Sequence, residues 1–173
     1  TGGCNTALGW QAMCKNTTGA NNVAVGKESL GANTTGTRNV AIGTLSLDAN
    51  TTADDNTAVG YESLGANTTG ANNTAFGKSS LKSNTTSDDN TALGFKTLCT
   101  NTTGVGNVGV GSYALQVNTT ANESTAVGYV ALATNTTGAQ NTAVGRGALQ
   151  VNTTGADNVG MGWNALSENT TGY

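Results

Sequence analysis

Histidine and proline are both absent from this 173-residue sequence, and each absence excludes something. Without His, the chain cannot build a His-based catalytic triad or the usual shell of a catalytic zinc ion. Ordinary usage would place roughly nine prolines in a chain of this length. Proline lacks the N–H group that a β-ladder needs, so its absence suits a backbone that bonds repeatedly to its neighbours. From the absence of His we expect a non-enzymatic chain without a metal or other cofactor.

Charged and bulky apolar side chains are also scarce. Charged residues make up 10% of the chain and aromatic residues 5%, and the net charge is −3. An acidic balance argues against binding to nucleic acid, because nucleic-acid-binding proteins carry basic faces that neutralise phosphates. No run approaches the roughly 18 consecutive apolar residues of a membrane span. Only 36% of the residues are hydrophobic, which predicts a thin core.

What the sequence does contain is a strict repeat of 17 residues. Ten units follow one another without an insertion or deletion, and each reads close to N-T-A-V-G-x-x-A-L-x-x-N-T-T-G-x-x, whose positions we number one to seventeen. A fixed period of this kind predicts units that stack on one another. Both ends fall inside the pattern, so we expect residues 1–173 to be a single β-solenoid segment cut from a longer array, without separate domains. The units begin at Asn5, Asn22, Asn39, Asn56, Asn73, Asn90, Asn107, Ser124, Asn141 and Asn158.

Each unit contains the signals of a short strand and two turns. Positions two to four are rich in β-branched residues, which favours a strand. Gly at position five, from Gly9 to Gly162, suits a turn or a close backbone approach. Leu recurs at position nine, and Asn-Thr-Thr followed by Gly closes the unit with a second turn. The order strand, turn, strand, turn predicts an all-β, parallel β-solenoid (β-roll) of ten 17-residue coils, about 48 Å long at a spacing of about 4.8 Å.

Position three suggests a contact between chains. It is Ala in eight units, and Gly109 or Gly160 in the other two. Strand alternation points it away from positions two and four, and an outward face open to water would sample Lys, Glu and Ser. Two interpretations remain: position three packs tightly against another chain, or the coil is flat and both of its faces are internal. We expect the partners to be copies of the chain itself, as a homotrimer or an end-to-end filament.

The strand residues also carry a family resemblance. Val-Ala-Val-Gly (23–26) and Val-Ala-Ile-Gly (40–43), each followed by x-x-Ser, resemble the head repeats of trimeric autotransporter adhesins, the YadA-like β-roll. The Asn-Thr-Ala-Val-Gly arrays are similar to repeats in some phage tail fibre proteins. This resemblance covers all ten units, and it implies a left-handed parallel β-roll, trimeric assembly, an extracellular place and a role in surface attachment. The unit here is longer than the adhesin repeat and contains an added Asn-Thr-Thr-Gly segment.

Position twelve is Asn in every unit, and each of these residues opens an Asn-Thr-Thr sequence that matches the N-glycosylation acceptor N-x-[ST]. Either this column carries covalent glycans on some of its sites, or its side chains form a structural hydrogen-bond ladder along the rod. The acceptor does not require the Thr of position thirteen, which favours the ladder or sugars linked to Thr hydroxyls. The candidates are Asn16, Asn33, Asn50, Asn67, Asn84, Asn101, Asn118, Asn135, Asn152 and Asn169, and, outside the column, Asn122.

Position six mixes aromatic and cationic residues, so side chains of neighbouring coils could form cation–π pairs. We expect an exposed ridge there, which either only stabilises the rod or contacts a surface glycan. The aromatic members of this ridge are Trp10, Tyr61, Phe95, Tyr129 and Trp163, with Lys78 and Arg146 among their neighbours.

The chain has three cysteines, an odd number, at Cys4, Cys14 and Cys99. Cys4 and Cys14 are close enough in sequence to form a disulfide in an extracellular setting. Three reduced thiols are the alternative. No C-x-x-C spacing occurs, which argues against a metal site.

These patterns together predict a structural repeat segment of an extracellular fibre or filament, glycosylated along its Asn-Thr-Thr column. The alternative is a trimeric adhesin head or a phage tail fibre shaft that binds a host surface or glycan. Either function places the chain outside the cell, on a cell surface or on a virion surface. Ice binding through Thr columns is a third hypothesis, which we disfavour because Thr17 and Thr18 are adjacent and point to opposite faces.

Overall fold

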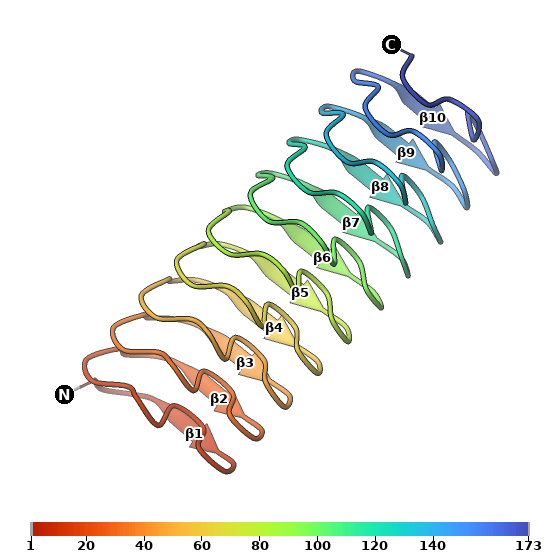
Figure 1. Cartoon of the computed structure of the whole chain (residues 1–173). Helices are drawn as coiled ribbons and strands as arrows, with labels where there is room; N and C mark the ends of the chain where they lie inside the picture. The colour runs from red at the N-terminus through yellow and green to blue at the C-terminus, as the bar shows by residue number, and fades with distance from the viewer. Residues whose placement is uncertain (1, 173) are drawn as a thin grey trace.

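The computed structural model describes residues 2–172, which form a rod of stacked coils without a helix. Each coil contributes one strand of three residues, and the strands make a single parallel sheet in sequence order (Figure 1). The parallel β-solenoid predicted from the repeat is therefore confirmed. The strands are β1 (Thr6–Leu8), β2 (Val23–Val25), β3 (Val40–Ile42), β4 (Thr57–Val59), β5 (Thr74–Phe76), β6 (Thr91–Leu93), β7 (Val108–Val110), β8 (Thr125–Val127), β9 (Thr142–Val144) and β10 (Val159–Met161).

Neighbouring coils are in strict register. Val40 of β3 lies opposite Thr57 of β4, 17 residues later, and the same offset holds for every strand pair. Backbone groups outside the strands also bond from coil to coil. For example, the N–H of Leu64 donates to the carbonyl oxygen of Ser80 at 3.0 Å. A proline would remove a donor from this ladder, which agrees with its absence from the sequence.

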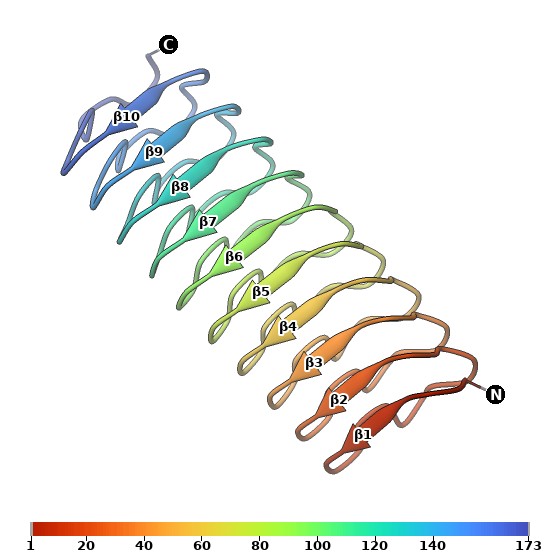
Figure 2. The same ribbon diagram turned by 180° about the vertical axis from the view of Figure 1, so that it is seen from behind.

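The second half of each coil differs from the prediction, because the expected second strand does not form anywhere in residues 2–172. Positions seven and nine both adopt the left-handed backbone conformation in every coil; in coil four, φ is 54° at Glu62 and 51° at Leu64. Two left-handed residues so close together interrupt an extended backbone. The return segment therefore runs as a series of turns, which lie behind the strands in Figure 2.

Glycine at position five serves both purposes expected of it. From Gly9 to Gly162, φ lies between 118° and 138°, which L side chains rarely adopt. A Cβ on Gly60 would also lie 2.7 Å from the carbonyl group of Gly77 in the next coil. Position fifteen, by contrast, does not require glycine: its φ is not positive, the left-handed residue of this corner falls on position seventeen, and Ala53, Ser87 and Ala121 replace glycine in three coils.

The core lies between the sheet and the return segment. We expected position three to point outward, but the opposite orientation is found. Position three points inward: Ala58 is 0% exposed and belongs to the same buried cluster as Leu64. Positions two and four point outward, so Val59 is only partly buried. The prediction that position three contacts another chain is therefore wrong. Small residues are required there because the Leu column packs against it; a Cβ on Gly160 would lie 3.0 Å from Cγ of Leu149.

Candidate functional site

The asparagines of position twelve form a hydrogen-bonded column inside the rod. Nδ2 of Asn67 donates to Oδ1 of Asn50 at 3.3 Å and to the carbonyl oxygen of Gly70 at 2.9 Å. The same pair of bonds recurs along the column, and its eight central members, from Asn33 to Asn152, are 0% exposed. Each of these amides uses both of its N–H groups. Among the described residues, no buried side-chain nitrogen or oxygen lacks a partner.

Position one forms a second column beside the first, which the sequence analysis did not single out. Nδ2 of Asn73 donates to Oδ1 of Asn56 at 3.2 Å, and the backbone N–H of Asn73 donates to the same oxygen at 2.9 Å. This column is interrupted at Ser124, whose hydroxyl donates to the carbonyl oxygen of Asn122 at 3.3 Å. The recurrence of Asn at position one was the available signal for this ladder.

These contacts bear on the candidate glycosylation sites. An N-linked glycan replaces one hydrogen of Nδ2 and needs room outside, whereas the eight central members of the column are buried with both hydrogens engaged. The folded chain thus contains the structural ladder that was one of the two interpretations. Asn16 and Asn169, in the outermost coils, are partly exposed. Asn122 is exposed, and its Oδ1 accepts the N–H of Val105 at 2.8 Å.

The two threonines that follow each column asparagine have different roles. Oγ1 at position thirteen donates to the backbone carbonyl of the next coil, as Thr68 does to Thr85 at 3.0 Å. This bond explains why Thr is invariant at a position that the acceptor sequence leaves free. Position fourteen points away from the core, and all of its residues, from Thr18 to Thr171, are exposed. The rod thus displays a continuous column of hydroxyl groups.

The position-six ridge lies on the surface. Trp10 is 60% exposed and Trp163 is 72% exposed, and Tyr61 and Tyr129 are exposed as well, whereas Phe95 is half-buried. Cation–π pairs join neighbouring coils along this ridge. The Nζ of Lys27 lies 5.1 Å from the ring centre of Trp10, that of Lys78 lies 5.7 Å from Tyr61, and the guanidinium of Arg146 lies 5.8 Å from Tyr129.

The ridge has a further aromatic member that the sequence analysis missed. Tyr113, at position seven, makes edge-to-face contacts with Phe95 and Tyr129, with ring centres 5.2 Å and 6.1 Å apart. Phe95 forms its cation–π pair within its own coil: the Nζ of Lys96 lies 5.5 Å from its ring centre. These contacts join position seven to position six, so neither position alone predicts them from the sequence.

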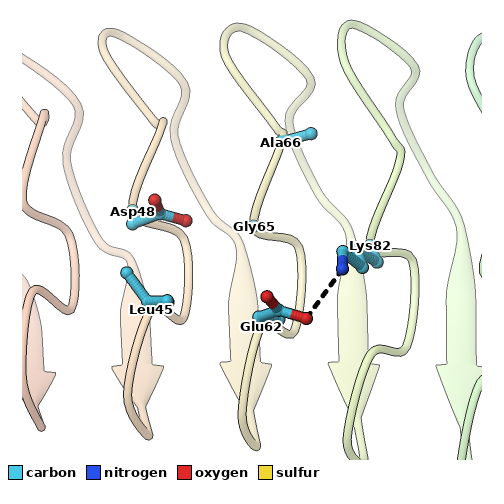
Figure 3. A pocket seen from close by; sticks show the side chains of 6 residues that line it. All are labelled: Leu45, Asp48, Glu62, Gly65, Ala66 and Lys82. Atoms are coloured by element: carbon cyan, nitrogen blue, oxygen red, sulfur yellow. Dashed lines mark ion pairs between the residues drawn. The ribbon is translucent and has the colours of Figure 1, made fainter.

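A shallow depression of about 220 Å³ opens on the return side of coils three to five (Figure 3). An ion pair of 2.8 Å joins Glu62 and Lys82, and it lowers the pKa of Glu62 and raises the pKa of Lys82. Partial burial raises the pKa of Asp48, and the negative charges of Glu28 and Glu62 raise it further. No group of three metal-ligating side chains occurs in residues 2–172. The depression is lined by Leu45, Asp48, Glu62, Gly65, Ala66 and Lys82.

The three cysteines are free thiols. Cys4 and Cys14 are exposed and are not joined by the candidate disulfide, and Cys99 is partly buried. Sγ of Cys14 lies 3.4 Å from the carbonyl oxygen of Gly31. Burial raises the pKa of Cys99.

Two further observations concern the chain as a whole. Within residues 2–172 there is no helix of the length and hydrophobicity needed to cross a bilayer. Comparison with protein families, with curated proteins and with solved structures finds no match to this chain.

Proposed function

We propose that this chain is a non-enzymatic structural repeat segment of an extracellular fibre or filament. The observation that carries the proposal is the pair of asparagine columns, which run through the stacked coils with their buried amides hydrogen-bonded. Fully satisfied polar networks of this kind rigidify a structure, and here they occupy interior space that a globular domain would fill with apolar side chains. A rod stiffened by a hydrogen-bonded interior is suited to bear mechanical load or to act as a spacer in a fibre.

The glycosylated form of this proposal places sugar on the threonines of position fourteen. Their hydroxyls are exposed along the whole rod, whereas the central asparagines of position twelve are enclosed. Mass spectrometry of the protein from its native source tests this part. We expect an intact mass above the bare 17.1 kDa for these residues, with the added mass released by β-elimination from Thr; an unmodified mass contradicts it.

Location and shape test the structural proposal itself. Antibodies raised against the recombinant rod are expected to label filaments outside the cells of the native source in immunogold electron microscopy. Small-angle scattering of the recombinant chain is expected to show a rod about 48 Å long, as ten coils at the usual strand spacing require. Labelling confined to the cell interior would overturn the assignment to a fibre.

A second function, a trimeric adhesin head or tail fibre shaft, is favoured by the exposed aromatic and cationic ridge. Trp10, Tyr61 and Tyr129 are exposed, each with a cation over its ring, and exposed aromatic side chains of this kind can contact sugar rings. Binding to a glycan array tests it. The triple variant Trp10→Ala, Tyr61→Ala, Tyr129→Ala is expected to lose binding, whereas Thr18→Ala, Thr69→Ala, Thr137→Ala is expected to keep it. Absence of binding by the wild-type chain leaves the purely structural function as the better account.

A further inference from the structure

The outward side of the sheet is an uncharged strip. We define the outward strip as positions two and four of β1 to β10, which all point away from the core and none of which is buried. Position four is apolar in every coil, and its exposed members include Ile42 at 40%, Phe76 at 57% and Leu93 at 38%. Position two is Val or Thr throughout. The position-four residues are Leu8, Val25, Ile42, Val59, Phe76, Leu93, Val110, Val127, Val144 and Met161.

Charge is confined to the two margins of this strip and to the return side. No charged residue occupies positions one to five in any coil. Lys27 and Arg146 lie at position six, beyond one margin, and the ion pair of Arg38 with Asp55 lies at position seventeen, beyond the other. An apolar centre with a polar, solvated rim is the usual anatomy of a protein interface. The largest exposed apolar patch of a protein is often a contact site.

The spacing of the coils indicates which partner fits the strip. The strands that carry it are stacked in order along the rod (Figure 2), so equivalent residues recur at every strand, about 4.8 Å apart. Only a surface with the same repeat stays in register over many coils, and a second copy of this chain has that repeat by identity. Because the strip carries no charge, two copies can face each other without opposing like charges. Face-to-face packing of two sheets about 10 Å apart is a common arrangement.

We propose that two copies of this chain associate side by side through their outward strips. The pairing is two-fold, because one flat strip per rod can face only one other strip. This inference rests on the proposed function as a fibre segment and adds that the fibre is built from paired rods.

The area of the strip sets the expected strength of this contact. Ten strands about 4.8 Å apart and three residues wide give a flat face of about 48 Å by 10 Å, or roughly 480 Å². This is below the roughly 800 Å² per partner of standard interfaces. We therefore expect a weak dimer that forms as concentration rises.

Sedimentation equilibrium over a concentration series tests the proposal. The wild-type mass is expected to rise from that of the monomer towards twice that value. The variant Val59→Lys, Leu93→Lys places two charges in the strip, two coils apart, and is expected to weaken association at least tenfold, since like charges would be buried unpaired. The control Thr69→Lys, Thr103→Lys adds the same charges to the same two coils at exposed position fourteen, and is expected to associate like the wild type. Thermal melts followed by circular dichroism confirm that both variants fold.

Three results would overturn the paired rod. These are a wild-type chain that stays monomeric up to about 1 mM, where even weak contacts are populated, a strip variant that associates as well as the control, and a closed trimer. None of them affects the rod shape seen by scattering at low concentration or the location of the native filament. Failure of the pairing can therefore be told apart from failure of the proposed function.

Discussion

Asn39 and Asn50 donate their side-chain Nδ2 groups to the same acceptor, the carbonyl oxygen of Ala53, at 2.8 Å and 3.2 Å. The two residues belong to different columns, so this shared carbonyl joins the two ladders across the interior of one coil. The pattern recurs at the carbonyl of Gly70, which accepts from Asn56 and Asn67. The interior is thus cross-linked within the coils that carry both asparagines as well as between coils.

Loss of one column asparagine should break bonds in two directions. We expect Asn67→Ala to lower the free energy of unfolding by about 2–4 kcal/mol, because it leaves the buried acceptors of Asn50 and Gly70 without this donor. Chemical denaturation measures the change. Thr69→Ala, at an exposed position of the same coil, serves as the control and should stay within about 0.5 kcal/mol of the wild type. Equal effects of the two substitutions would contradict a structural ladder.

The interruption at Ser124 offers the converse experiment. Ser124→Asn restores the residue type of the other coils and adds an amide that can bond to Oδ1 of Asn107 and to the carbonyl of Gly138. We expect a gain of about 1 kcal/mol in the free energy of unfolding, read from the midpoint of urea denaturation. Ser124→Ala removes the hydroxyl that Asn141 contacts at 3.3 Å and should be destabilising. A loss of stability in the Asn variant would show that this coil does not accept the common residue.

Two substitutions to valine at neighbouring positions of β5 test which side of the strands faces the core. Ala75 is 0% exposed and faces the Leu column, so Ala75→Val should cost about 1–3 kcal/mol through overpacking. Thr74→Val, one residue earlier, adds no volume to the core and should be close to neutral. Differential scanning calorimetry compares the two melting temperatures. A neutral Ala75→Val would contradict the inward orientation of position three.

Asp48 should make the rod less stable at neutral pH than its amide counterpart. Burial and nearby acids raise its pKa in the folded chain above the usual value. The folded state therefore holds a proton more tightly than the unfolded state, and stability falls as pH rises from the unfolded pKa through the raised folded pKa. We expect Asp48→Asn to raise the melting temperature at pH 7 and to do so less at pH 3. Solvent screening should keep the gain under about 1 kcal/mol.

The cysteines should differ in reactivity. The thiolate is the reactive form, and the raised pKa of Cys99, with its partial burial, leaves less of it at a given pH. We expect alkylation of Cys99 at pH 8 to be slower than that of exposed Cys4 and Cys14, as followed by peptide mass spectrometry. In denaturant the three rates should converge; a difference that persists there would have its origin in local sequence rather than in the fold.

The repeat predicted the register because register follows from the 17-residue spacing, and the β-branched residues of positions two to four predicted the strand. It could not reveal that Leu64 and its equivalents are left-handed, since nothing in leucine's preferences favours that conformation. It also pointed to the wrong inner face. The larger Val59 looked like core beside Ala58, but a core thin enough for one Leu column leaves room only for a methyl group opposite it. The partly buried ridge residue Tyr113 could not be found from one repeat position alone, because its contacts run between two repeat positions.

Every pair of neighbouring coils packs in the same register, so the number of coils can change without a new kind of contact. Because Val40 meets Thr57 in the same way as Val23 meets Val40, removing or duplicating one 17-residue unit recreates a joint that already exists elsewhere. Rod length can then vary in steps of about 4.8 Å with no new packing problem to solve. Unequal recombination between units would thus change the length of the rod in whole coils, while the insertion of a single residue would disrupt the contacts of the coil in which it falls.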